Sequence, residues 1–125
     1  MIFGLGCDIV DHSVVEMLNW AKDERFLNRT FTSKEIDLFN DLKNTSFLAG
    51  RFAAKEATLK ALGIGLHDGI SMKEIEILKS ETGSPYVNLR GELKIFANEQ
   101  GITTIHISLS HTIKQSTAYV ILEKL

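Results

Sequence analysis

The feature that most constrains this fold is an alanine-rich segment in the middle of the chain, residues 49–65. Alanine is the strongest helix former, and the alanines recur at helical spacing: Ala53, Ala54, Ala57 and Ala61. A start signal over residues 44–46 precedes the segment, and Gly63 follows it. These signals predict one long helix that ends near Gly63. Because its side chains are so small, the helix can lie close to a neighbouring element.

Two charged residues of this helix stand one turn apart. Glu56 and Lys60 are spaced i, i+4, so their side chains leave the same face. Such a pair is usually a solvated surface ion pair worth about 0.3–0.5 kcal/mol, and Arg51 and Lys55 usually belong to a polar helix face. The alternative is a site for a phosphate ester and its divalent ion, because the turn at 63–65 frees backbone amides. That turn matches neither a P-loop nor a dinucleotide fingerprint, so no ATPase or dehydrogenase is indicated.

Asp8 is an unexpected acid in the otherwise apolar, β-like segment 2–10, which Gly4 and Gly6 interrupt. Those glycines indicate a bulge or a close backbone approach. Burying an unpaired carboxylate is costly, so Asp8 faces water at a strand end, caps the next helix or binds a metal. Mg²⁺ prefers one or two carboxylates with water and phosphate oxygens. Asp8 and Glu56 could supply these if the strand lies beside the helix.

The remaining elements follow from caps, turns and periodicity. We expect one helix over about 13–20, a second that starts at the capping box Thr32-Ser33-Lys34-Glu35, and a third over 91–100. We expect strands near 75–77, 86–89, 105–111 and 117–122. The last two strands form a hairpin. This order lacks regular βαβ alternation, so it predicts one α+β domain over residues 1–125, a small antiparallel sheet packed against a long helix and shorter helices.

Composition excludes several classes of protein. Fourteen basic against sixteen acidic residues give a net charge of -2, which argues against a nucleic-acid binder held by bulk charge. No apolar run reaches about 18 residues, so no membrane span is expected. The N-terminus does not read as a signal peptide, and the one cysteine, Cys7, cannot form an internal disulfide. We therefore expect a cytoplasmic protein in which Cys7 is buried and inert.

A second candidate site lies in the strand over 105–111, where polar residues alternate with apolar ones. Ser108 and Ser110 with His111 could indicate a serine hydrolase, but no Gly-x-Ser-x-Gly elbow is present. A histidine at such an edge is usually a polar surface residue, and it can also contact a phosphate or a leaving group.

Taken in order, these motifs are more specific than any one of them. They are Gly4-Leu5-Gly6-Cys7-Asp8-Ile9-Val10, Arg25-Phe26 through Arg29, Phe31-Thr32 with Glu35, Ala49-Gly50-Arg51-Phe52-Ala53-Ala54-Lys55-Glu56-Ala57 with Lys60-Ala61, Gly83-Ser84-Pro85 and Ser108-Leu109-Ser110-His111. Over essentially the whole chain this set resembles the holo-acyl-carrier-protein synthase family, the short 4′-phosphopantetheinyl transferases.

The resemblance implies a transfer reaction and its fold. Members move the 4′-phosphopantetheine arm of coenzyme A onto a serine of apo-acyl carrier protein and release adenosine 3′,5′-bisphosphate, in support of fatty acid biosynthesis. Magnesium is the implied cofactor. The short members are homotrimers with active sites at the subunit interfaces, so a homotrimer is expected here.

The resemblance also implies roles for individual residues. Asp8 and Glu56 match the metal-binding acids, and Lys60 matches the lysine that meets the pyrophosphate. Glu56, directly or through a metal-bound water, is the candidate base for the carrier serine. Other positions match residues that approach the coenzyme or its nucleotide, partly from the neighbouring subunit: Arg51, Gly63, Gly65, Ser84, Pro85 and His111.

One departure from the family pattern concerns docking of the carrier. Many members carry an arginine in the first helix after the Asp-Ile-Val motif, whereas residues 11–16 here contain none. Lys22, Arg25 and Arg29 are the candidate replacements. Two alternatives therefore stay open beside the enzyme: a module that binds coenzyme A without turnover, and an oligomeric scaffold that does not bind it.

Overall fold

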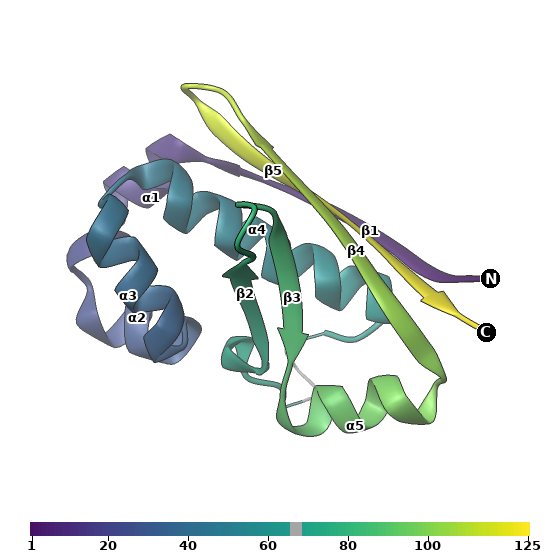
Figure 1. Ribbon diagram of the computed structural model, residues 1–125. Helices are drawn as coiled ribbons and strands as arrows, with labels where there is room; N and C mark the ends of the chain where they lie inside the picture. The colour runs from purple at the N-terminus through teal and green to yellow at the C-terminus, as the bar shows by residue number, and fades with distance from the viewer. Residues whose placement is uncertain (66–68) are drawn as a thin grey trace.

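The computed structural model describes residues 1–65 and 69–125. Its centre is a three-stranded antiparallel sheet in the order β1 (Ile2–Asp11), β5 (Gln115–Lys124) and β4 (Ile102–His111). One long helix, α4 (Thr45–Leu62), lies across one face of this sheet (Figure 1). The mixed α+β architecture expected from the element order is confirmed.

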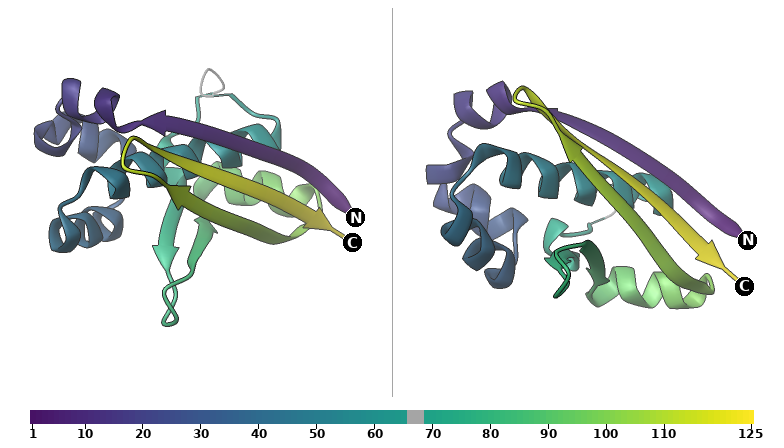
Figure 2. Two further views of the ribbon diagram at one scale, coloured as in Figure 1. Left: turned by 90° about the horizontal axis from the view of Figure 1, so that it is seen from above. Right: turned by 45° about the horizontal axis from the view of Figure 1, so that its top comes forward.

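The other elements surround α4 on the sides that the sheet leaves open. They are α1 (His12–Met17), η1 (Trp20–Lys22), α2 (Glu24–Thr30), α3 (Ser33–Leu42), η3 (Met72–Glu74), β2 (Ile75–Lys79), β3 (Pro85–Leu89) and α5 (Gly91–Glu99). β2 and β3 pair only with each other, as a second antiparallel sheet. The expectation of one small sheet was therefore incomplete, and Figure 2 shows this hairpin projecting away from β1.

Two glycines let β1 approach α4 more closely than any side chain would allow. A Cβ atom placed on Gly4 would lie 1.9 Å from the carbonyl oxygen of Ala61, and one on Gly6 would lie 1.9 Å from that of Ala57. The β1–β5 register also shifts between Ile2 and Gly4. The predicted close approach and the predicted irregularity are both present, and together they set β1 directly on the alanine face of α4.

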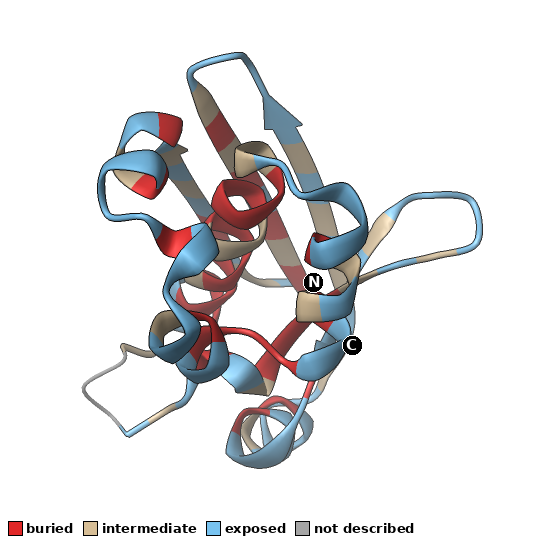
Figure 3. Ribbon diagram, turned by 90° about the vertical axis from the view of Figure 1, so that its left-hand side faces the viewer, coloured by how far each residue is buried: buried red, intermediate tan, exposed pale blue. Residues whose placement is uncertain are grey.

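The ends of α4 are as the sequence predicts. The Asn44 side chain accepts a hydrogen bond from the Phe47 backbone N–H over 2.8 Å, and Gly63 closes the helix in a left-handed conformation with φ of 76°. Between these ends most side chains are buried, as Figure 3 shows. A helix buried on nearly all sides packs against several layers at once, so α4 is the core around which the sheets and the shorter helices assemble.

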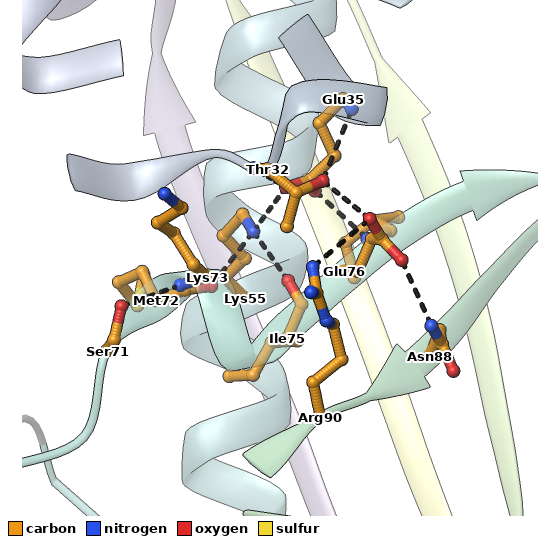
Figure 4. A network of polar contacts seen from close by, with 11 residues as sticks. Thr32, Glu35, Lys55, Ser71, Met72, Lys73, Ile75, Glu76, Asn88 and Arg90 are labelled. Carbon is orange, nitrogen blue, oxygen red and sulfur yellow. Dashed lines mark hydrogen bonds and ion pairs between the residues drawn. The ribbon is translucent and has the colours of Figure 1, made fainter. Parts of the chain in front are cut away.

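Lys55 is fully buried, so its expected place on a polar helix face is wrong. Its ammonium donates to Glu35 Oε1 over 2.8 Å and to the carbonyl oxygens of Met72 and Ile75 (Figure 4). Burial lowers the pKa of Lys55, and the charge of Glu35 opposes that shift. Glu35 also accepts from the backbone N–H of Ile77, so one ion pair joins α3, α4 and β2.

The same network continues to the β2–β3 hairpin. The Thr32 hydroxyl donates to Glu76 Oε2 over 2.6 Å, and the Asn88 amide donates to Glu76 Oε1 over 3.0 Å. Arg90 lies 3.7 Å from Glu76 Oε2. Thr32 and Glu35 also form the predicted capping box of α3. The cap therefore does more than start a helix, because its two side chains anchor the hairpin to α4.

Two local expectations near the N-terminus were wrong. The helix expected over 13–20 ends at Met17, because Asn19 adopts a left-handed conformation with φ of 54° before η1 begins. Cys7 is exposed rather than buried, since its side chain leaves β1 on the face opposite α4. Across the described residues, no helix combines the length and apolar character needed to cross a membrane.

Candidate active site

Asp8, Glu56 and Lys60 meet where β1 crosses α4. Lys60 Nζ lies 3.0 Å from Asp8 Oδ1 and donates a second hydrogen bond of 3.0 Å to the carbonyl oxygen of Cys7. Asp8 lies inside β1 rather than at its end, and it makes this contact instead of capping α1. Within the described residues Lys60 pairs with Asp8, not with Glu56, so the surface i, i+4 pair considered from the sequence is not formed.

The electrostatics of Glu56 are those of an acid near a second acid. Partial burial raises the pKa of Glu56, and the charge of Asp8 raises it further, while Lys60 lowers it. The hydrogen bond and charge of Asp8 raise the pKa of Lys60. The site therefore holds two carboxylates, Asp8 and Glu56, that repel each other. It also holds the half-exposed ammonium of Lys60, which Asp8 keeps in its charged form.

This donor set fits a hard cation that shares its coordination with water and substrate. Among residues 1–65 and 69–125, no group of three or more His, Cys, Asp and Glu side chains could hold a metal ion by itself. Two neighbouring carboxylates suit Mg²⁺, which keeps several waters and takes substrate phosphate oxygens as ligands. A cation between Asp8 and Glu56 would relieve the repulsion that raises the pKa of Glu56.

The glycine turn lies next to Lys60 but differs from the expectation in one respect. The Gly63 N–H donates to the carbonyl oxygen of Lys60 over 3.1 Å, and the Ile64 N–H donates to that of Leu59 over 3.0 Å. These two amides close the helix and are not freed for a ligand. Gly65 follows directly, at the edge of the described part of the chain.

Arg51 and His111 form a second group at the other end of α4. Together with Ser116 they line a cavity of about 190 Å³ between α4, β4 and β5. The Arg51 guanidinium stacks over Phe47, 4.1 Å from the ring centroid, and its Nε is buried with no hydrogen-bond partner. Burial lowers the pKa of Arg51, against the opposing charge of Glu35. A guanidinium that lines a small cavity and has a buried N–H without a partner among the described residues suits an anionic ligand.

The two groups are separated within one chain. Arg51 precedes Lys60 by nine residues, which is about 14 Å along a helix axis, and it lies about 140° around the axis from Glu56. Ser84 and Pro85 belong to neither group, since Ser84 lies in the turn of the β2–β3 hairpin and Pro85 begins β3.

The serine-hydrolase alternative finds no support in the strand geometry. Ser108 and Ser110 are exposed on the outer face of β4, whereas Ile107 and Leu109 are half-buried against the core. His111 follows Ser110 directly, so the two side chains leave opposite faces of the strand. They do not form a nucleophile and base pair.

Comparison with known proteins assigns the family. The model of the 4′-phosphopantetheinyl transferase superfamily matches residues 4–120 of this chain. The chain belongs to this superfamily. A holo-acyl-carrier-protein synthase from Clostridium kluyveri is 43% identical over 125 residues, which cover 98% of this chain and 91% of the relative.

Solved structures of this transferase superfamily share the fold over the full chain. The holo-acyl-carrier-protein synthase of Neisseria meningitidis superposes with a TM-score of 0.90 at 34% identity, covering 99% of this chain and 100% of its own. The enzyme from Bacillus anthracis, in complex with coenzyme A (3′,5′-ADP), superposes with a TM-score of 0.81 at 33% identity, covering 100% and 99%. The fold expected from the resemblance is therefore confirmed.

Proposed function

We propose that this protein is a holo-acyl-carrier-protein synthase. It transfers the 4′-phosphopantetheine arm of coenzyme A to a serine hydroxyl of apo-acyl carrier protein and releases adenosine 3′,5′-bisphosphate, in support of cytoplasmic fatty acid synthesis. The observation that carries the proposal is the meeting of Asp8, Glu56 and Lys60 at the β1–α4 crossing, in a chain of the transferase superfamily.

The residues suit phosphoryl-type transfer, which needs charge neutralisation more than covalent help from the protein. The carrier serine oxygen attacks the phosphorus that bears the pantetheine arm, and the phosphoanhydride bond to the nucleotide breaks. Lys60 stabilises the charge that develops on the departing bisphosphate. Glu56 takes the serine proton, directly or through a water molecule.

Asp8 and Glu56 are the residues that would hold Mg²⁺. When bound there, the ion would supply positive charge that neutralises the phosphates of the substrate. Lys60 donates to Asp8 and thereby orients its carboxylate beside Glu56. Both acids would bind the cation, whereas only Glu56 takes the proton. Substitution of either acid should therefore change the Mg²⁺ dependence of the reaction in the same way.

We propose further that the protein is a homotrimer with interfacial active sites. The outer face of the three-stranded sheet exposes apolar side chains, among them Leu5 at 65%, Ile9 at 54% and Tyr119 at 54%. An exposed apolar sheet face of this kind marks an interaction surface. In such an assembly, Arg51 and His111 of one subunit can complete the Asp8–Glu56–Lys60 group of the next, which accounts for their separation in a single chain.

The carrier protein requires a docking surface outside the reacting groups. Arg25 and Arg29 are exposed one turn apart on α2, and Lys22 precedes them in η1. Arg29 also borders a cleft of about 580 Å³, lined mainly by apolar side chains that include Phe26 and Phe52. An apolar cleft with Arg29 at its border and two further basic residues nearby in sequence suits an acidic amphipathic helix, so α2 takes the docking role for which α1 has no arginine.

The test is intact-mass spectrometry of an apo-acyl carrier protein incubated with this protein, coenzyme A and Mg²⁺. We expect a mass gain of one phosphopantetheine arm per carrier, lost on adding EDTA and restored by excess Mg²⁺. Coenzyme A binding without any mass gain would contradict the proposal and favour a binding-only module. Absence of both would favour a scaffold.

Variants locate the activity at the proposed site. Asp8→Asn and Glu56→Gln should each abolish the mass gain, because each removes one of the two carboxylates. Glu92→Gln is the matched control, since Glu92 is exposed on α5, outside both groups. Retained activity in Asp8→Asn would remove Asp8 from the metal site.

A further inference from the structure

His12 is a buried histidine that no step of the proposed reaction uses. It begins α1 and is 8% exposed, and its backbone N–H and two ring nitrogens contact the β4–β5 turn and the start of β5. Its backbone N–H donates to the Lys114 carbonyl oxygen over 2.8 Å. The ring Nδ1 lies 3.1 Å from the Ile113 carbonyl oxygen, and Nε2 lies 2.8 Å from Ser116 Oγ.

The partners of the ring determine how its hydrogens are arranged. A carbonyl oxygen can only accept, so Nδ1 carries the proton and donates it to Ile113. In the neutral ring Nε2 is then an acceptor, and the Ser116 hydroxyl donates to it over 2.8 Å in preference to the Ser46 carbonyl oxygen, which lies 3.4 Å away. The His12 ring therefore contacts the turn at two points. One is the Ile113 carbonyl oxygen within the turn, and the other is the Ser116 hydroxyl near the start of β5.

Ser116 connects this contact to the second group of the candidate site. It is the cross-strand partner of His111 in β4, and it lines the same cavity as Arg51 and His111. The turn itself projects at one end of the sheet, where Ile113 is 92% exposed (Figure 1). Bonds within the turn run between its own residues, such as the Thr112 N–H to the Gln115 carbonyl oxygen, and they do not fix it to the body.

We infer that His12 is a positioning residue for the coenzyme site. It anchors the β4–β5 turn to α1 and, through Ser116, fixes the strand segment that carries His111. This inference rests on the proposed function, in which His111 approaches coenzyme A. A loose His111 would have to be ordered when the coenzyme binds, and that ordering lowers affinity. In the described part of the chain, Asp8, Glu56 and Lys60 do not line the cavity that Arg51, His111 and Ser116 share, so we expect the rate with bound substrate to stay unchanged.

The test is steady-state kinetics of the full-length protein with coenzyme A as the varied substrate. His12→Leu, which removes both ring hydrogen bonds, should raise KM for coenzyme A about tenfold and leave kcat within about twofold. His12→Asn keeps a donor near the position of Nδ1, so its KM should lie closer to that of the wild type. Ser116→Ala should raise KM as well. The double variant His12→Leu/Ser116→Ala should raise KM by less than the product of the two single effects, because the two changes share the His12–Ser116 hydrogen bond.

The control separates positioning from general destabilisation. Val15 is buried on the same helix, in the apolar cluster that contains Trp20 and Leu48, so Val15→Ala should lower Tm and leave KM unchanged. An unchanged KM in His12→Leu, or an equal rise in Val15→Ala, would overturn the inference. If His12→Leu does not fold, Ser116→Ala carries the test, and an unchanged KM there overturns it. A wild type that transfers nothing would instead refute the proposed function.

Discussion

Replacing Lys55 with methionine tests whether the buried ion pair stabilises the core. Methionine keeps the length of the side chain and removes its charge. Lys55 donates to Glu35 and to two backbone carbonyls, so Lys55→Met strips three acceptors of their donor at once. Removing one partner of a buried ion pair costs about 3–5 kcal/mol, because the other charge stays buried without compensation. Since domains are stable by about 5–15 kcal/mol, this is a large fraction of the total.

The structure indicates that the loss falls toward the lower end of that range. Glu35 keeps two backbone donors after the substitution, the N–H groups of Thr32 and Ile77 at 2.9 Å and 3.0 Å. These continue to stabilise its carboxylate, so we expect a loss of about 3 kcal/mol in the free energy of unfolding. The double variant Lys55→Met/Glu35→Gln removes the stranded charge and should recover about 1 kcal/mol of it.

Guanidinium chloride unfolding, followed by the fluorescence of the buried Trp20, measures this loss. All variants are compared at one protein concentration, because assembly would add to apparent stability. Lys94→Met, at an exposed position of α5, is the matched control and should change stability by less than about 0.5 kcal/mol. A loss below about 1 kcal/mol in Lys55→Met would refute the reasoning, since the network would then add almost nothing.

Three further predictions follow from the close packing, the acid pair and the exposed sheet face. The pKa of Glu56 lies above its ordinary value, so stability declines as the pH rises through it. In EDTA at pH 7 the Tm of Glu56→Gln should therefore equal or exceed that of the wild type, whereas its phosphopantetheine transfer should fall by about 10²-fold or more. A Tm below that of the wild type would contradict the assigned repulsion. Gly6→Ala should lower the free energy of unfolding in urea by about 2 kcal/mol or more, because its Cβ would strike the Ala57 carbonyl. Gly50→Ala in α4, with its nearest contact at 3.9 Å, should raise that free energy by about 0.5–1 kcal/mol. Equal effects of the two changes would be inconsistent with the close approach of β1 to α4. Tyr119→Glu should yield monomers in light scattering if the outer sheet face is the trimer interface, and an unchanged mass would exclude that face.

Local signals in the chain predicted local structure well. The capping box of Thr32 and Glu35, the Asn44 cap and the Gly63 stop all lie where the pattern placed them. Each depends on backbone hydrogen bonds between residues three or four positions apart, so the neighbouring sequence is sufficient to specify them. The alternation over 105–111 likewise separates a core face from an exposed face without reference to any other element.

Side chains whose partners are distant in the sequence were predicted poorly. Lys55 reads as part of a polar helix face, and only the arrival of Glu35 and of the η3–β2 segment makes it a buried ion pair. Cys7 was expected to be buried, whereas its side chain leaves β1 on the outer face of the sheet and is exposed. Lys60 turns to Asp8, 52 positions away, rather than to its helical neighbour Glu56.

The amino-acid sequence alone was enough to identify the residue types of a phosphate-handling site, the long helix that carries most of them and the family pattern. It did not contain their arrangement into two groups. That arrangement arises because Gly4 and Gly6 let β1 sink onto α4, which brings Asp8 to Lys60, while β4 and β5 carry His111 and Ser116 to Arg51 at the opposite end of the helix. Short-range hydrogen bonding selects helices and strands, but only packing in three dimensions decides which side chains from remote segments meet.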